Sequence, residues 1–345
     1  MRYPNSIRAG GRIGFIAPSF GCTFEPYISA FESAQRYFRE AGFDTLTGEN
    51  CFKAEGFGKS APPEACGREI NEFFTSPDVD AVISCGGGET MCEDLEYVDL
   101  ERISRARPRW FMGYSDNTNL TFTLPTLCDT AAVYGPNAPA FGMRPLHRSL
   151  EDALGVLKGS IRTVYGYPLW EKTSLKTAED PLAPYNVTEP SRTRLYSSRE
   201  AAPNQNVTFS GRLIGGCLDC LVNLAGTRFD KAGAFSERYK SDGLIWFLEA
   251  CDLTPAGVRR ALWQLDNAGW FRHVSGFILG RPMHIDEEPF GMTFEEAAAG
   301  ILAKYRVPVV LDADIGHLPP SMPVVSGAPA RITLKGSVLR IDHLF

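Results

Sequence analysis

The chain has 345 residues, 44% of them hydrophobic, and a formal net charge of −6. This length fits about two globular domains, and an acidic chain without a basic block is a poor partner for nucleic acid or an anionic membrane. The sequence has neither an apolar run of about eighteen residues nor a signal-peptide pattern at its N-terminus. We therefore expect a soluble, cytoplasmic protein that acts on a small molecule.

The first part of the chain alternates between strand and helix patterns. Apolar runs at residues 11–17, 79–87 and 109–115 predict strands, and apolar residues at helical spacing over 27–41 and 63–76 predict helices between them. Alternating strands and helices are typical of a parallel sheet covered on both faces. We therefore expect an α/β fold.

Small residues follow three of these strands. Pro18-Ser19, Gly86-Gly87-Gly88 and Tyr114-Ser115 each come at the end of an apolar run. Parallel sheets bind ligands beyond the carboxyl ends of their strands. We expect these three segments to share one ligand-binding rim.

The composition changes at residues 159–206, which are rich in Pro, Ser, Thr, Arg and Glu and have no sustained period. They predict a long connection. A second α/β pattern follows, so we expect three parts: residues 1–158, the connection 159–206, and residues 207–345. The strand candidates of the last part are residues 207–217, 243–250, 274–280 and 307–316, its helix candidates are residues 254–269 and 293–305, and residues 330–343 predict a closing hairpin.

Nine cysteines are scattered from Cys22 to Cys251 rather than spaced as a disulfide framework. The one CxxC motif, Cys217 to Cys220, could be half of a zinc site or a redox pair, but no second CxxC or close His pair accompanies it. We expect reduced structural thiols, no metal and no cofactor.

The segment GYSDN, residues 113–117, joins an expected strand to an apolar-periodic stretch. It is similar to the GxSxG nucleophile turn, with Asn in place of the last Gly. Such a turn lifts a serine hydroxyl out of the sheet and points the next backbone amides at the same space. Ser115 or Asp116 could equally be a helix N-cap, and these residues alone leave both interpretations open.

A glycine loop, SCGGGE, occupies residues 84–89 after another expected strand. It lacks the third glycine of a dinucleotide motif and the Gly-Lys-Ser/Thr of a phosphate loop. Glu89 would also compete with a phosphate for the positive end of a following helix. We favour glycine amides that approach a substrate carbonyl over a simple tight turn.

A serine nucleophile needs a base and an orienting carboxylate. His317 follows an apolar strand on a loop stiffened by two prolines, and His284 is the second candidate. Glu249 ends an apolar strand, where a carboxylate must be solvated or paired, and Asp252 is its alternative. Each of these could also be an ordinary polar loop residue.

These motifs occur together in the order of one family. GYSDNT, the preceding glycine loop, GRLIGGC, WFLEACD and DADIGHLPP make the chain resemble the LD-carboxypeptidases and the related microcin C immunity peptidases, over nearly its whole length. The resemblance implies that Ser115 is the nucleophile, His317 the base and Glu249 its orienting partner. It also implies an oxyanion hole formed by the amides of Gly87 and Asp116.

The family further implies a Rossmann-like N-terminal domain, a smaller swivelling C-terminal α/β domain that carries Glu249 and His317, and a homodimer. Two departures stand out. The family's Gly-Gly-Asn is Gly215-Gly216-Cys217 here, and its usual RGGYG loop is CGGGET. Both changes put the details of substrate recognition in doubt.

The expected reaction is hydrolysis of an amide bond through an acyl-enzyme. The first expected substrate is a muropeptide with a terminal D-amino acid, and the alternative is an aminoacyl-nucleotide of the microcin C type. Gly86 and Gly88 are expected to line the substrate, and Trp170 or Tyr185 could stack on a nucleobase. A non-catalytic protein that binds a small ligand is the alternative from another class.

Overall fold

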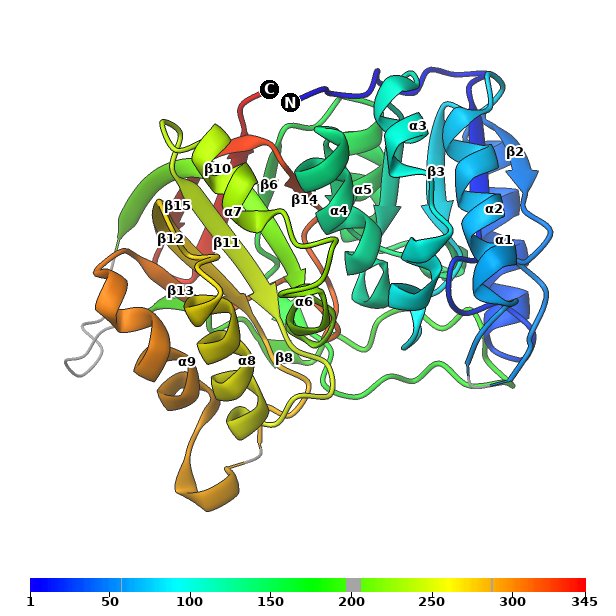
Figure 1. The fold of residues 1–345 in the computed structure, drawn as a ribbon. Coiled ribbons are helices and arrows are strands. Elements are labelled where there is room, and N and C mark those ends of the chain that lie inside the picture. Colours follow the sequence, from blue (N-terminus) through cyan, green and yellow to red (C-terminus); the bar gives the residue numbers. More distant parts are fainter. Residues whose placement is uncertain (57, 197–205, 287) are drawn as a thin grey trace. The chain divides into compact units, whose positions relative to one another are not determined.

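The computed structural model describes residues 1–56, 58–196, 206–286 and 288–345, and the chain forms two compact units (Figure 1). Unit 1 consists of residues 1–161 and 173–186, and unit 2 takes the remainder. The boundaries expected at residues 158 and 206 stay predictions. Within the described ranges, no helix has the length and apolar character needed to cross a membrane.

Unit 1 is built on a parallel sheet with strands in the order β5-β4-β3-β1-β2. Its centre is apolar: Phe15 of β1 is fully buried and packs against Phe31 and Phe38 of α1. The strands are β1 (Arg12–Ile16), β2 (Asp44–Thr47), β3 (Ala81–Ser84), β4 (Trp110–Gly113) and β5 (Ala132–Tyr134). The helices are α1 (Tyr27–Glu40), α2 (Pro63–Thr75), α3 (Leu100–Arg105), α4 (Thr118–Cys128) and α5 (Arg148–Leu157), with 3-10 turns η1 (Met91–Glu96), η2 (Ser115–Asn117) and η3 (Ala138–Gly142).

Unit 2 contains a mixed sheet in the order β6-β16-β15-β10-β11-β12-β13-β9. The four central strands, β10 to β13, are parallel, and antiparallel strands flank them. The strands are β6 (Thr163–Tyr165), β7 (Leu169–Trp170), β8 (Glu189–Pro190), β9 (Arg194–Leu195), β10 (Val207–Cys217), β11 (Leu244–Glu249), β12 (Val274–Gly280), β13 (Val309–Ala313), β14 (Val324–Ser326), β15 (Pro329–Lys335) and β16 (Val338–His343). The helices are α6 (Leu218–Leu224), α7 (Ala232–Arg238), α8 (Pro255–Asn267) and α9 (Phe294–Leu302), with 3-10 turns η4 (Pro289–Gly291) and η5 (Ala303–Tyr305).

The predicted α/β class is confirmed, because both sheets have a parallel core connected through helices. Residues 159–206, expected to be a connection, include the short strands β6 to β9. Strands of two or three residues are too short to show the alternation of apolar and polar residues that reveals a strand in sequence.

Candidate active site

Ser115 lies in the sharp turn between β4 and α4. β4 ends at Gly113, and α4 begins three residues after Ser115. The φ angle of Ser115 is 66°, in the left-handed region that residues with a side chain rarely adopt. Its amide donates to the Tyr134 hydroxyl at 3.2 Å. A strained serine between a strand and a helix is the geometry of a nucleophile turn.

The glycine loop after β3 lies directly against this serine. A Cβ built on Gly87 would lie 3.0 Å from the Cβ of Ser115 and 3.1 Å from its Oγ. The Gly86 carbonyl accepts a hydrogen bond from Asn117 Nδ2 at 2.7 Å. Gly88 has a φ of 143°, and a Cβ there would lie 2.0 Å from Ser19 Oγ. The loop approaches Ser115 this closely because it has no side chains.

Asp116 anchors the turn through its side chain. Its Oδ2 accepts hydrogen bonds from the Ser19 hydroxyl at 2.6 Å and from the Met91 amide at 2.9 Å. Its Oδ1 accepts one from Asn119 Nδ2 at 3.0 Å, and the residue is almost fully buried. These bonds hold the peptide that directly follows the serine.

Sequence reasoning missed Asn137 as a member of this network. Its Oδ1 accepts hydrogen bonds from the Tyr114 amide at 3.3 Å and from Asn117 Nδ2 at 3.2 Å. Asn137 follows β5 by three residues, so the rule that ligand sites gather at strand ends would have found it if applied to this strand.

Glu249 and His317 form a pair within unit 2. Glu249 is the last residue of β11 and has no exposed surface, while His317 lies on the loop after β13. His317 Nδ1 and Glu249 Oε2 are 2.9 Å apart. Gly316 has a φ of 108°, and a Cβ there would lie 2.7 Å from Glu249 Oε2. The pair fixes the orientation of the imidazole.

A buried ion pair supports the histidine loop. Arg281, just after β12, has its Nη1 2.6 Å from Asp314 Oδ1 and donates from Nη2 to the Leu318 carbonyl at 3.2 Å. The Tyr167 amide donates to Asp314 Oδ2 at 2.7 Å. Burial raises the pKa of Asp314, and the positive charge of Arg281 opposes that rise. Sequence reasoning found neither partner, because each looks like an ordinary charged residue after a strand.

The CxxC segment braces the chain after Glu249. Asp219, within the motif, accepts hydrogen bonds from Cys217 Sγ at 3.2 Å and from the Cys251 and Asp252 amides at 3.1 and 3.0 Å. All nine cysteines have free thiols. Burial raises the pKa of Cys251, although the neighbouring His317 lowers it. Asp252, the alternative carboxylate, is exposed, whereas Glu249 is the acid paired with His317.

The remaining candidates are distributed over both units. Trp170 is in unit 2, nearly buried, with the Arg281 guanidinium 5.0 Å from the centre of its ring. Tyr185 is in unit 1, half-buried, with its ring 5.5 Å from that of His147. His284 lies in a turn after β12. The described residues contain no cluster of three or more His, Cys, Asp or Glu side chains that could hold a metal ion.

A hydrolase of the serine peptidase type, with two α/β units, is the class that this fold and these motifs define, and comparison with known proteins identifies the family. Residues 13–135 match the LD-carboxypeptidase N-terminal domain, and residues 210–332 match the LD-carboxypeptidase C-terminal domain. The chain belongs to the LD-carboxypeptidase family.

Relatives in two functional groups cover most of the chain. The microcin C7 self-immunity protein MccF of Escherichia coli is 25% identical over 98% of this chain and 95% of its own length. The murein tetrapeptide carboxypeptidase of Pseudomonas aeruginosa is 23% identical over 89% of this chain and 88% of its own length. The crystal structure of an MccF-like protein from Bacillus anthracis matches with a TM-score of 0.81 at 22% identity, over 100% of both chains. Family membership favours an enzyme over the non-catalytic binding protein considered from the sequence.

Proposed function

We propose that the protein is a serine carboxypeptidase that releases a terminal D-amino acid from a muropeptide through an acyl-enzyme. The observation that carries this proposal is the contact of 2.9 Å between His317 Nδ1 and Glu249 Oε2 in a chain of the LD-carboxypeptidase family. The left-handed backbone of Ser115 beside a bare glycine loop supports its assignment as the nucleophile.

In the first half of the proposed reaction, Ser115 Oγ attacks the carbonyl carbon before the terminal residue while His317 Nε2 takes the hydroxyl proton. Glu249 holds the other ring nitrogen and stabilises the imidazolium that forms. The amides of Gly87 and Asp116 donate to the oxyanion, and Gly86 and Gly88 line the substrate. The C–N bond then breaks, and His317 returns the proton to the departing amine.

In the second half, His317 takes a proton from a water molecule, whose oxygen attacks the ester carbonyl of Ser115. The C–O bond to the serine breaks, and the proton returns to Ser115 Oγ. The products are the shortened peptide and the free amino acid. No group beyond the side chains and amides already named is needed for the proton balance.

An aminoacyl-nucleotide of the microcin C type is the second candidate substrate. Similarity to MccF proteins along the whole chain favours it. MccF has been solved in complex with aspartyl sulfamoyl adenosine, and an MccF-like protein from Streptococcus pneumoniae in complex with AMP. Trp170 or Tyr185 would then supply the aromatic face on which a nucleobase stacks.

Hydrolysis of the two substrates by one preparation tests both candidates. The protein is incubated separately with a muropeptide tetrapeptide and with aspartyl sulfamoyl adenosine, and the released amino acid is measured. We expect faster release from the tetrapeptide and a loss of about four to six orders of magnitude in Ser115→Ala. A folded Ser115→Ala protein with near-normal turnover would falsify the nucleophile assignment. Exclusive cleavage of the sulfamoyl compound would replace the first substrate with the second.

We further propose that the protein is a homodimer, on the strength of the family resemblance, and that it acts in the cytoplasm, the compartment expected from the sequence. Light scattering coupled to gel filtration measures the mass of the particle, which should be twice the 38.0 kDa of one chain. Cell fractionation tests the compartment.

A further inference from the structure

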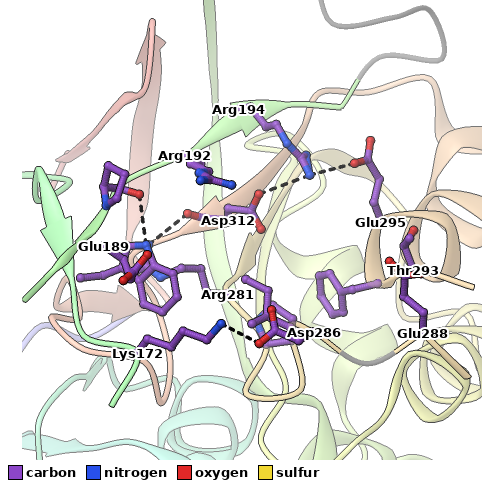
Figure 2. Close-up of a pocket in the computed structure, with 15 residues that line it drawn as sticks. Lys172, Glu189, Arg192, Arg194, Arg281, Asp286, Glu288, Thr293, Glu295 and Asp312 are labelled. Carbon is purple, nitrogen blue, oxygen red and sulfur yellow. Dashed lines mark hydrogen bonds and ion pairs between the residues drawn. The ribbon is translucent and has the colours of Figure 1, made fainter. Parts of the chain in front are cut away.

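Unit 2 contains a cavity of about 500 Å³ whose lining includes neither Glu249 nor His317. This volume suits a small molecule. Figure 2 shows its charged side chains gathered around the hollow, from the β7–β8 ribbon, from β9, from the ends of β12 and β13, and from the start of α9. The charged lining residues are Lys172, Arg192, Arg194 and Arg281, with Glu189, Asp286, Glu288, Glu295 and Asp312.

Several of these charges neutralise one another. Lys172 Nζ lies 2.7 Å from Asp286 Oδ2. Arg194 Nη2 lies 2.8 Å from Glu295 Oε2 and 3.3 Å from Asp312 Oδ2 (Figure 2). These contacts tie the lining together and leave other charged groups of the same cavity for a ligand.

Two guanidinium donors at this cavity are buried without an acceptor. Arg281 is 2% exposed, and its Nε has no hydrogen-bond partner among the described residues. The Nη1 of Arg194 is likewise buried and without a partner in the described part of the chain. Buried N–H groups are nearly always satisfied, and these two donors would gain an acceptor from the cavity if their guanidinium groups rotated toward it. Their natural complement is a carboxylate or a phosphate.

The backbone of Asp312 places a carboxylate among these arginines. Its φ is 57°, where β13 shifts register against β12. Strain of this kind gathers at ligand sites. Burial raises the pKa of Asp312, while the charges of Arg194, Arg281 and Arg192 oppose that rise. A ligand with a high negative charge would be repelled by the carboxylates of Asp312 and Glu295, which line the same cavity.

The mouth of the cavity carries both signs of charge. Arg192 and Glu288 are exposed, and neither makes an ion pair with another described residue. Glu189 is half-buried beside them and accepts a single hydrogen bond, from Thr188 Oγ1 at 3.3 Å. The groups left for a ligand are therefore guanidinium donors and carboxylates together. This mixture disfavours a polyanion and matches a molecule with one carboxylate and one ammonium group.

We propose that this cavity binds a short zwitterionic peptide, with its carboxylate on Arg192 and its ammonium group on Glu189 and Glu288. Neither Glu249 nor His317 lines this cavity, so the site is separate from that pair. The two sites are connected through Arg281, which lines the cavity and donates a hydrogen bond to the carbonyl of Leu318, the residue after His317. The proposal concerns binding and does not depend on the proposed reaction.

Isothermal titration of the full chain with three matched probes tests this proposal. The probes are alanyl-alanine, its N-acetyl derivative without the ammonium group, and its C-terminal amide without the carboxylate. We expect the unmodified dipeptide to bind at least about tenfold more tightly than either derivative. Arg192→Gln should remove the preference for a free carboxylate, and Glu288→Gln the preference for a free ammonium group. Ser115→Ala and His317→Ala should leave the dissociation constant unchanged.

Arg260→Gln is the matched control, because Arg260 is exposed on α8 and outside the cavity. It should bind like the unmodified protein. The proposal is overturned if no dipeptide binds at millimolar concentration, if Arg192→Gln binds like Arg260→Gln, or if His317→Ala abolishes binding. Inorganic phosphate or AMP that binds more tightly than the dipeptide, and does so through Arg192, would also overturn it and would assign the cavity to phosphates.

Discussion

Two glycines, Gly87 and Gly316, lie directly against the side chains of Ser115 and Glu249. Gly87 admits the Ser115 side chain, and Gly316 admits the Glu249 carboxylate, in spaces where a Cβ would lie 3.1 Å or less from the nearest oxygen. A methyl group at either position would have to displace the reacting side chain or the loop that carries it. Geometry at this level decides whether an oxyanion donor reaches its acceptor.

Gly87→Ala should lower kcat by about two to three orders of magnitude, the cost of one oxyanion donor, while the free energy of unfolding changes by less than about 1 kcal/mol. The added methyl group would press on Ser115, and the amide of residue 87 would move from its place. Steady-state kinetics and urea unfolding measure the two effects. Gly233→Ala, on α7 with no atom within 4 Å of the added Cβ, is the control and should keep full activity. Equal kcat values in both variants would remove Gly87 from the oxyanion hole.

Asp94 makes stability depend on pH. The residue is 4% exposed, its Oδ2 has no hydrogen-bond partner among the described residues, and burial with the nearby Asp116 raises its pKa to about 8. Between about pH 4 and pH 8 the folded protein keeps this proton and the unfolded chain loses it, so stability falls as pH rises through that window. Asp94→Asn should therefore be increasingly more stable than the unmodified protein above pH 5. By pH 8.5 the gain should exceed about 1.4 kcal/mol, the equivalent of one pKa unit.

Urea unfolding at pH 5 and pH 8.5 gives the difference for Asp94→Asn. Asp78→Asn, at an exposed position, is the control. Its free energy of unfolding should differ from that of the unmodified protein by the same amount at pH 5 and at pH 8.5. A gain for Asp94→Asn that does not change with pH would contradict the raised pKa.

At the scale of secondary structure, the sequence predicted the long elements well. β1, β4, β11 and β12 are apolar runs bounded by Gly, Ser or charged residues, and a run of that kind marks a buried strand. Ser115 and Glu249 were found because each stands where such a run ends. The Glu249–His317 contact spans 68 residues and the Arg281–Asp314 pair spans 33, and no local pattern encodes such distances. The family resemblance predicted the Glu249–His317 pair, whereas nothing in the sequence predicted the Arg281–Asp314 pair.

The last strand, β16, carries a histidine that should make folding sensitive to acid. His343 is buried, its Nε2 accepts a hydrogen bond from the Val325 amide at 3.2 Å, and its Nδ1 lies 3.2 Å from the Arg162 carbonyl. Burial lowers its pKa from 6.5 to about 4. Below pH 6.5 the unfolded chain takes up a proton that the folded ring refuses, so stability is lost as pH falls toward 4, by up to about 3 kcal/mol.

His343→Gln should lower stability at pH 7, because it disturbs a buried ring, but flatten the decline between pH 7 and pH 4. The free energy of unfolding measured across this range gives the slope for each protein. Equal slopes in the two proteins would show that other groups cause the acid sensitivity.

At the scale of the whole molecule, the proposed catalytic groups are divided between the two units. Unit 1 carries Ser115 with its glycine loop, and unit 2 carries Glu249 with His317. Each half is held by its own network, the first through Asp116 and the second through the loop that contains Asp314. His317 can activate Ser115 only if both residues act on the same substrate bond. Combining substitutions of the two residues tests whether they do.

The double variant Ser115→Ala/His317→Ala should be about as active as either single variant. Groups that act as one catalytic unit give strongly non-additive losses, so each single change already removes about four to six orders of magnitude and the second removes little more. Turnover of the preferred substrate by the four proteins, with circular dichroism to verify folding, completes the cycle. Gly233→Ala/Arg260→Gln, a pair of surface changes outside the proposed site, should retain normal turnover. Losses that multiply in the Ser115/His317 double variant would mean that the two residues contribute independently, and the proposed acyl-enzyme mechanism would then lack its base.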